Sequence, residues 1–327
     1  MEKNDTQISK ENLILFDWLT VTSKIDSPES LMELLGLSHV AWQKMEKGRN
    51  GYRQRLFFEN ISILYDGAEN MGVCLDITGS GCRALETYST EPNPWESIFT
   101  WIYMNGDDYN ITRLDMAYDD YTGILDIEQI HDDTDDHHYV SRFRGKSKWK
   151  VEYGSAGTTV YHGSPKSNMY IRIYDKGAQQ DLDDVHWIRV EMQMRDEIAK
   201  GFVWGLTGNS VGDQFRGVLH NYLRYVVPVE DTNMSRWPLA DYWAELLQDV
   251  QRIRVWSTPG VDYTEWHLHN YIINQTGNAL DCYLSIFGVE DLIRELGKRS
   301  IRISPKYERL KAKYEALKQR RQQPDES

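Results

Sequence analysis

The sequence predicts an α+β fold in which an antiparallel sheet crossed by helices is followed by a mainly helical C-terminal part. Up to residue 195, short segments rich in β-branched and aromatic residues alternate with turn signals, as is typical of strands. From residue 197 onward, apolar residues recur at helical spacing. With 327 residues, the chain can form one large domain or two ordinary ones. We assign residues 12–225 to a core and residues 237–327 to a helical C-terminal region.

The individual elements follow from the same patterns. A helix should begin after Ser27-Pro28, and Gly79-Ser80-Gly81 should interrupt the chain before the next helix. The predicted strands lie at residues 13–22, 54–58, 61–65, 73–78, 111–119, 158–161, 169–174 and 187–195. The predicted helices lie at residues 27–35, 83–88, 94–105, 127–133, 198–204, 212–225, 239–254, 265–287, 289–297 and 305–321. Residues 226–236 are the expected boundary between the core and the C-terminal region.

The composition argues against several classes of protein. The sequence contains no run of about 18 apolar residues, so no membrane span is expected. Residues 1–11 lack the basic-then-apolar pattern of a secretory signal. Three widely spaced cysteines, Cys74, Cys82 and Cys282, indicate a reducing cytosol rather than a disulfide framework. Phosphate-loop and dinucleotide motifs are missing from the sequence, which argues against ATP- or NAD-driven chemistry. We therefore expect a cytoplasmic protein.

The net charge of −13 is unusual for a nucleic-acid-binding protein, but the charges are unevenly distributed. Residues 107–136 hold eleven acidic residues and one basic residue, Arg113. The next segment holds five bases in nine residues: Arg142, Arg144, Lys146, Lys148 and Lys150. Residues 294–321 form a basic tail with eleven bases and three acids. Phosphate binding requires a local basic surface rather than a basic average, although solvated charged faces explain each run equally well.

Three of the predicted strands carry polar residues on one face. Side chains alternate between the two faces of a strand, so residues two apart share a face. In the segments at residues 113–119, 170–174 and 189–195, one face is apolar. The other face carries, strand by strand, Arg113, Asp115, Ala117 and Asp119; Tyr170, Arg172 and Tyr174; and Arg189, Glu191, Gln193 and Arg195.

Two interpretations of these polar faces remain open. They are either the water-facing side of an antiparallel sheet or, if the three strands are neighbours, a single chemical site. Clustered carboxylates favour a bound divalent cation, and arginine binds phosphate in a bidentate manner. Tyrosine can attack phosphorus and hold a covalent intermediate. The second interpretation therefore predicts a phosphoryl-transfer site.

Six segments within residues 13–200 resemble the replication initiation factor family of plasmids, phages and conjugative transposons, which includes the MobT-type relaxases. They occur in family order, which is more specific than any one of them. The segments are Asp17-Trp18-Leu19-Thr20-Val21-Thr22, Thr78-Gly79-Ser80-Gly81-Cys82-Arg83, Thr112-Arg113-Leu114-Asp115-Met116-Ala117-Tyr118-Asp119-Asp120, Gly163-Ser164-Pro165-Lys166-Ser167, Tyr170-Ile171-Arg172-Ile173-Tyr174-Asp175-Lys176 and Arg189-Val190-Glu191-Met192-Gln193-Met194-Arg195. The stretch at Arg236-Trp237 resembles the C-terminal part of the family more weakly.

The resemblance implies a nickase core, that is, an enzyme that cuts one DNA strand at an origin with the help of Mg²⁺ or Mn²⁺. A tyrosine attacks the phosphate, becomes linked to the 5′ end and frees a 3′ hydroxyl. By position, Asp115 and Glu191 correspond to metal ligands, and Asp119 is a candidate third ligand.

The nucleophile is expected in the strand at residues 170–174, where Tyr170 and Tyr174 are both candidates. We favour Tyr174 because it directly precedes Asp175-Lys176. Arg172 lies between the two tyrosines on the same face and would hold the scissile phosphate. Lys176 would assist the attacking or the leaving oxygen, because a nearby ammonium stabilises a phenolate.

The resemblance also implies partners. The main partner is single-stranded or cruciform origin DNA, and a helicase, the conjugation machinery and a second copy of the chain are further candidates. A separate helix-turn-helix, present in some family members, does not fit before the strand that begins near residue 13. The DNA contacts are therefore expected from the core and the basic segments: Arg113, Arg189, Arg195, Lys166, Arg142, Arg144, Lys146 and Lys148, with Lys298, Arg299, Arg302, Lys306 and Lys313 as candidates in the basic tail.

Other functions remain open on the sequence alone. A replication initiator and a MobT-type relaxase share the same chemistry, and a metal-dependent nuclease using water would form no covalent adduct. A DNA-binding protein that has lost cleavage is the alternative from a different class. His267-Leu268-His269 matches the histidine signature of another nickase superfamily but is more simply interpreted as part of a helix or loop. His162 and His186 flank the site strands and are weaker metal-ligand candidates.

Overall fold

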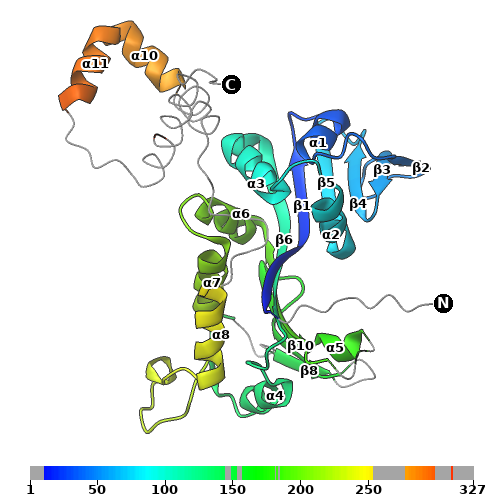
Figure 1. Cartoon of the computed structure of the whole chain (residues 1–327), viewed down its shortest axis with the longest axis vertical. Helices are drawn as coiled ribbons and strands as arrows, with labels where there is room; N and C mark the ends of the chain where they lie inside the picture. The colour runs from blue at the N-terminus through cyan, green and yellow to red at the C-terminus, as the bar shows by residue number, and fades with distance from the viewer. Residues whose placement is uncertain are drawn as a thin grey trace, which may run out of the picture. The chain divides into compact units, whose positions relative to one another are not determined.

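The structure is a computed structural model that describes residues 11–143, 149–152, 157–180, 182, 185–252, 277–298 and 311 (Figure 1). Among these residues, ten strands form one sheet in the order β2-β3-β4-β5-β1-β6-β11-β10-β9-β8. All neighbouring strands in this sheet are antiparallel. The predicted α+β fold with an antiparallel sheet and helices at the C-terminal end is therefore confirmed.

The strands of the large sheet agree closely with the sequence pattern. The strands are β1 (Leu13–Ser23), β2 (Gln43–Met45), β3 (Gln54–Phe58), β4 (Ile61–Tyr65), β5 (Val73–Thr78), β6 (Tyr109–Asp120), β8 (Trp149–Glu152), β9 (Thr159–Gly163), β10 (Met169–Asp175) and β11 (Ile188–Arg195). A second sheet pairs β7 (Tyr139–Ser141) with β12 (Leu223–Tyr225). The short strands β2, β7, β8 and β12 were not predicted.

The helices are α1 (Pro28–Leu34), α2 (Gly79–Tyr88), α3 (Pro94–Met104), α4 (Ile127–Asp135), α5 (Lys176–Gln179), α6 (Asp196–Gly205), α7 (Val211–Tyr222), α8 (Asp241–Arg252), α10 (Gly277–Phe287) and α11 (Val289–Lys298). Two 3-10 turns, Gly106–Asp108 and Met234–Arg236, connect them. Ser27 caps α1 by accepting from the backbone N–H of Ser30, as the start signal predicted. In the described part of the chain, no helix is both long and apolar enough to cross a bilayer.

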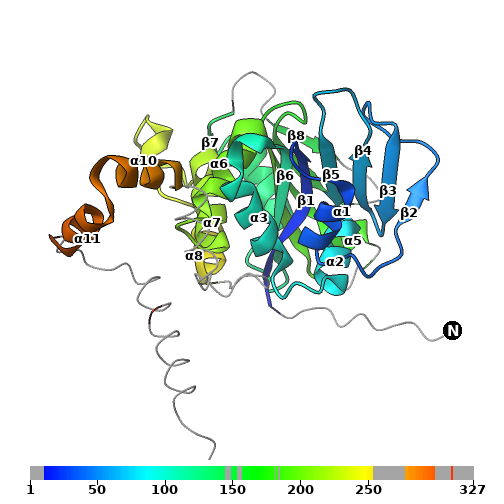
Figure 2. The ribbon, with the colours of Figure 1, turned by 90° about the horizontal axis from the view of Figure 1, so that it is seen from above.

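The apolar face of the sheet forms the core. Leu114, Met116, Val190 and Met192 point to this face and are fully buried. Helix α6 packs on β6 and β11, and α2 packs on β1, β4 and β5, so these helices cover the apolar face (Figure 2). Because side chains alternate along a strand, burial of the apolar face places the polar side chains of the central strands on the opposite face of the sheet.

The expected interruption at Gly79–Gly81 is wrong, because these residues form the first turn of α2. A Cβ atom at Gly81 would lie 2.5 Å from the carbonyl oxygen of Asn60 in the turn between β3 and β4. The glycine therefore permits close approach of the helix to this turn rather than ending an element. The helix predicted at residues 212–225 also ends earlier, at Tyr222. The next three residues form β12, which pairs with β7.

The chain divides into two compact units, residues 1–99 with 105–258 and residues 100–104 with 259–327. Helix α8 belongs to the first unit, because it packs against α7 and buries Trp243 and Leu246 completely. The carboxylate of Asp249 on α8 accepts hydrogen bonds from the Tyr118 hydroxyl and the Asn12 amide, both at 2.9 Å. The boundary expected at residues 226–236 therefore lies inside the first unit.

Among its described residues, the second unit contains residues 100–104 of α3 together with α10 and α11. The Tyr283 hydroxyl on α10 donates a 2.8 Å hydrogen bond to Asp291 on α11. Residues 305–321, predicted to be helical, and His267-Leu268-His269 fall outside the described residues, apart from Lys311, which is helical.

His162 on β9 gives the fold a pH dependence. Its ring is fully buried and bonds the Tyr225 hydroxyl at 2.9 Å. Burial lowers the pKa of His162 from 6.5 to about 3. The unfolded chain therefore binds a proton below pH 6.5 that the folded chain does not.

We expect the stability from this group to be complete above pH 6.5 and to fall by about 1.4 kcal/mol per pH unit on acidification toward pH 3. Urea unfolding at several pH values measures this slope. His162→Gln should flatten the slope, whereas His39→Gln, at an exposed position, should leave it unchanged. Equal slopes for the His162 variant and the unmodified protein would contradict this assignment.

Candidate active site

The three polar strand faces meet on adjacent strands, β6, β11 and β10. The strand register places Tyr174 opposite Arg189 and Arg172 opposite Glu191. The hydrogen-bonded neighbour of Arg189 on the other side is Asp119. The hypothesis that the polar faces of these strands form one surface is thus confirmed.

The carboxylates of this surface are buried, which excludes a simple water-facing sheet. Asp115 and Asp119 are each 1% exposed, and Glu191 is 3% exposed. A buried carboxylate requires a partner, because moving an ion out of water is strongly unfavourable. Arginines provide these partners here.

Two arginine–carboxylate pairs occupy the centre of the site. Arg113 binds Asp115, with Nε 2.9 Å from Oδ1 and Nη2 2.5 Å from Oδ2. Arg172 donates from Nη2 to Oε1 of Glu191 across the β10–β11 pair. Burial alone would lower the pKa of Arg172, but the charge of Glu191 and its hydrogen bond outweigh burial and raise it. Both arginines are placed to exchange a carboxylate for a phosphate.

Tyr174 contacts the same glutamate. Its hydroxyl donates a 3.1 Å hydrogen bond to Oε2 of Glu191. Burial, followed by the charge of Glu191, raises the pKa of Tyr174, whereas Arg189 and Arg172 act in the opposite direction. A carboxylate in this position can accept the phenolic proton as the oxygen attacks.

Lys176 lies beside the same tyrosine, with its ammonium 5.6 Å from the ring centroid of Tyr174. Burial and the charge of Arg189 lower the pKa of Lys176. Lys176 is therefore a more ready proton donor than an exposed lysine. Tyr170 lies further along β10, opposite Gln193, and stacks on Tyr161 with ring centroids 5.7 Å apart.

Asp119 pairs with an arginine of the neighbouring strand β11. Arg189 binds both of its oxygens, with Nε 2.6 Å from Oδ1 and Nη2 2.7 Å from Oδ2. Arg189 also lies 3.4 Å from Asp17. Within the described residues, no group of three metal-binding side chains is formed. Asp119, the candidate third ligand, is held at both oxygens by Arg189, and its role as a metal ligand remains a prediction.

Asp115 and Glu191 fit a divalent cation. They share a face of adjacent strands, since Gln193 pairs with Asp115 and Glu191 lies two residues away. Burial raises the pKa of Asp115 to about 6 despite its pairing with Arg113, and Glu191 adds to the increase. Mg²⁺ and similar ions bind one or two carboxylates and complete their coordination with water and phosphate oxygens. A pair of neighbouring carboxylates, in which the charge of Glu191 raises the pKa of Asp115, matches this preference.

A second polar cluster, which the sequence did not predict, continues the same face on β1 and β5. Asp76 accepts hydrogen bonds from the Thr20 hydroxyl at 2.7 Å and the Trp18 indole at 3.1 Å. Arg49 forms an ion pair with the same carboxylate. A charged residue within the apolar run of β5 was the available signal, and Trp18 and Thr20 were noted only as part of a motif.

The remaining candidates are spread more widely. Lys166 lies in an exposed turn whose Pro165 carbonyl accepts from the Gln193 amide at 3.3 Å. Arg142 is exposed after β7, and Arg195 ends β11 opposite Arg113. His162 points to the opposite face, and His186 bonds Asp120 at 3.2 Å. Lys298 lies on α11. The other predicted basic residues fall outside the described residues, namely Arg144, Lys146, Lys148, Arg299, Arg302, Lys306 and Lys313.

Removing the Asp119 carboxylate should destabilise the fold strongly. Asp119→Ala leaves the buried guanidinium of Arg189 without its bidentate partner, and we expect a loss of about 3 kcal/mol or more in unfolding free energy. Urea unfolding measures this loss. Asp66→Asn removes the charge of an exposed pair with Arg53, suits the left-handed backbone of this position, and should change the unfolding midpoint little. Similar midpoints for the two variants would contradict the structural role of Asp119.

Comparisons with known proteins cover both halves of the sheet. Residues 109–296 match the family model described as replication initiation factor. Residues 13–101 match the model described as rolling circle replication initiation protein N-terminal domain.

Two relatives are similar to most of the chain. The NicK protein of Bacillus subtilis (strain 168), named as a DNA relaxase, is 25% identical over 283 residues, covering 80% of this chain and 78% of that protein. The solved structure of the rolling circle replication initiator protein from Geobacillus stearothermophilus superimposes with a TM-score of 0.68 at 31% identity. That match covers 76% of this chain and 99% of the other.

Proposed function

The chain belongs to the replication initiation factor family, and we propose that it is a rolling-circle replication initiator that nicks and rejoins one DNA strand through a 5′-phosphotyrosine intermediate. The observation that carries this proposal is the contact between the Tyr174 hydroxyl and Glu191 beside Arg172. It brings a nucleophile, a proton acceptor and a phosphate-binding cation together on two paired strands.

The proposed reaction begins with attack of the Tyr174 phenolic oxygen on the scissile phosphorus. The phenolic proton passes to Oε2 of Glu191 as the new oxygen–phosphorus bond forms. The bond from phosphorus to the 3′ oxygen breaks, and that oxygen takes a proton from Lys176. Attack by a 3′ hydroxyl on the phosphotyrosine reverses these transfers and rejoins the strand.

The other residues bind and orient the substrate. Arg172 would exchange Glu191 for the phosphate, and Arg189, fixed by Asp119, would favour the developing phenolate through its charge. Asp115 and Glu191 would hold Mg²⁺ or Mn²⁺. A divalent ion at this position supplies positive charge to the phosphate during transfer.

The proposal can be tested by incubating the protein with Mn²⁺ and single-stranded oligonucleotides that cover inverted repeats flanking its gene. On a denaturing gel, we expect a slowly migrating DNA band that protease treatment removes. Cleavage without such a band would favour a nuclease that uses water. Binding without cleavage of any of the oligonucleotides would favour a DNA-binding protein that has lost the reaction.

A conjugative relaxase is the second candidate, favoured by the similarity to NicK. It would use the same residues and the same intermediate. The distinction lies in the partners, namely a replicative helicase in one case and the conjugation machinery in the other. A homodimer on inverted repeats remains a prediction for both.

A further inference from the structure

The polar face of the sheet continues beyond the active site toward its N-terminal strands. Arg113 on β6 pairs in register with Thr20 on β1, and Thr20 pairs with Asp76 on β5. Asp76 pairs with Ser62 on β4, which pairs with Phe57 on β3. These side chains therefore share one face with Asp115 and extend it across four further strands.

Two arginines on this face lie against aromatic rings. The guanidinium carbon of Arg113 is 3.8 Å from the ring centroid of Trp18, and that of Arg55 is 4.7 Å from Phe57. Both aromatic residues are partly exposed. Ring faces with adjacent guanidinium groups are the platforms on which unpaired bases stack in proteins that bind single strands.

This part of the face also carries excess positive charge. Arg49 and Arg55 both lie near one carboxylate, Asp76, and both donate to the Ser62 hydroxyl. The Arg49 side chain is 39% exposed, whereas Asp76 is buried. Burial and the charge of Arg49 lower the pKa of Arg55 despite the presence of Asp76. An anion bound beside the two guanidinium groups would relieve this repulsion.

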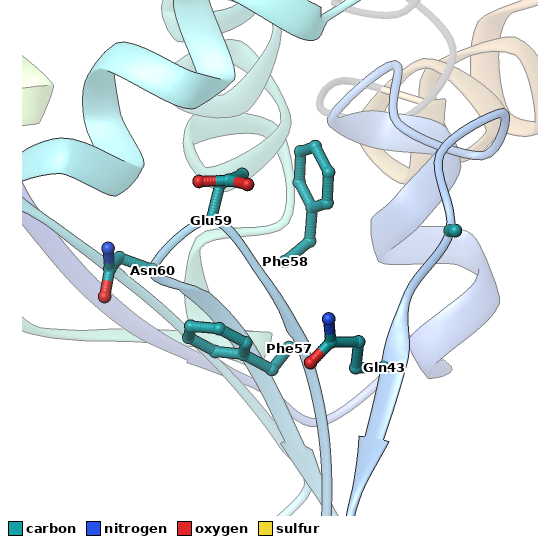
Figure 3. Close-up of a pocket in the computed structure, with 6 residues that line it drawn as sticks. Gln43, Phe57, Phe58, Glu59 and Asn60 are labelled. Atoms are coloured by element: carbon teal, nitrogen blue, oxygen red, sulfur yellow. The ribbon is translucent and has the colours of Figure 1, made fainter.

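A pocket of about 340 Å³ lies at the outer end of the same region (Figure 3). It is lined by Ala41, Gln43, Phe57, Phe58, Glu59 and Asn60. The Gln43 side chain points toward the two phenylalanines in the close-up. An aromatic pocket with amide donors and acceptors has the chemistry that an unstacked base requires.

We propose that the face formed by β1, β5, β4 and β3 is a track for single-stranded DNA that leads away from the nicking site. Bases stack on Trp18 and Phe57, and backbone phosphates contact Arg49 and Arg55. This inference rests on the proposed function, because the track is taken to begin at the nicking site beside Tyr174. From β6 to β3 it spans four strand spacings, roughly 19 Å, which is enough for several nucleotides.

The test measures DNA binding without cleavage. Fluorescence anisotropy in EDTA compares a short oligonucleotide covering only the nick site with oligonucleotides extended by several unpaired nucleotides on either side. The double variant R49A/R55A removes the track cations. The matched control K44A/R53A removes the same charge from two exposed residues that do not contact Ser62 or Asp76.

We expect R49A/R55A to weaken binding of one extended oligonucleotide roughly tenfold or more, and to leave the short one unchanged. The plot of log affinity against log salt concentration should become shallower by about 1.4, because two phosphate contacts are lost. The control should match the unmodified protein on every oligonucleotide. W18A, which keeps every charge, should lower affinity for the same extended oligonucleotide.

Equal affinity of R49A/R55A and K44A/R53A for both extended oligonucleotides would overturn the track. A loss confined to duplex DNA of the same sequence would also overturn it. Urea unfolding midpoints establish that the variants are folded. Because no cleavage is needed, loss of binding in R49A/R55A supports the track even if the unmodified protein forms no covalent adduct, a result that would reject only the proposed chemistry.

Discussion

Replacing Tyr174 with phenylalanine is expected to abolish the covalent DNA adduct and to reduce strand nicking by about 10³-fold or more. The substitution removes only the hydroxyl that contacts Glu191 and retains the ring that packs in the site. Nicking is measured with a labelled origin oligonucleotide and Mn²⁺, and adduct formation is read from the same denaturing gel. Affinity for uncleaved DNA should remain close to that of the unmodified protein.

Tyr170→Phe is the matched control for this substitution. Tyr170 shares the strand and the face of Tyr174 but lies opposite Gln193 rather than Arg189. We expect this variant to retain the adduct. If Tyr170→Phe loses the adduct and Tyr174→Phe keeps it, the nucleophile is Tyr170, and the contact with Glu191 has another purpose.

The second large effect is expected for Glu191→Gln. The amide cannot accept the phenolic proton as a carboxylate does, and it is a poorer ligand for a hard cation. We expect nicking to fall by at least about 100-fold. Calorimetric titration of Mn²⁺ into the protein should show weaker binding for the variant, because the glutamate is also a proposed metal ligand.

Glu86→Gln provides the comparison. Glu86 is also a largely buried carboxylate paired with an arginine, Arg83, but it lies on α2. This variant should nick DNA and bind Mn²⁺ like the unmodified protein. Unchanged Mn²⁺ binding with lost nicking in Glu191→Gln would reject Glu191 as a ligand and keep it as the proton acceptor.

Much of this site could be predicted from the sequence because residues two apart share a face wherever a strand is regular. Tyr174, Glu191 and Asp115 were assigned to polar faces by alternation, and the register confirms that these faces coincide. Sequence alone could not show the order of the strands, because the paired residues of β6 and β11 are 68 to 82 positions apart in the chain. The adjacency of the site residues was therefore a hypothesis until the sheet was known.

The partners of each charge were not predictable. Asp119 and Asp115 have the same parity on β6, yet Asp119 lies opposite Arg189 and Asp115 lies two residues from Arg113 on its own strand. Ion pairing depends on which neighbour each carboxylate meets, and this follows from register rather than pattern. The partners of Asp76 could not be predicted for the same reason, because they come from β1 and from the loop that contains Arg49.

The hydrogen bonds of Asp249 to Asn12 and Tyr118 have a consequence for the synthesis of the protein. They join residues separated by 237 and 131 positions. A nascent chain therefore emerges from the ribosome with its first strand complete but with Asn12 and Tyr118 still awaiting their acceptor on α8. Strands β10 and β11 are made before that acceptor, so the first unit acquires these hydrogen bonds only after α8, close to its last residue, has been synthesised.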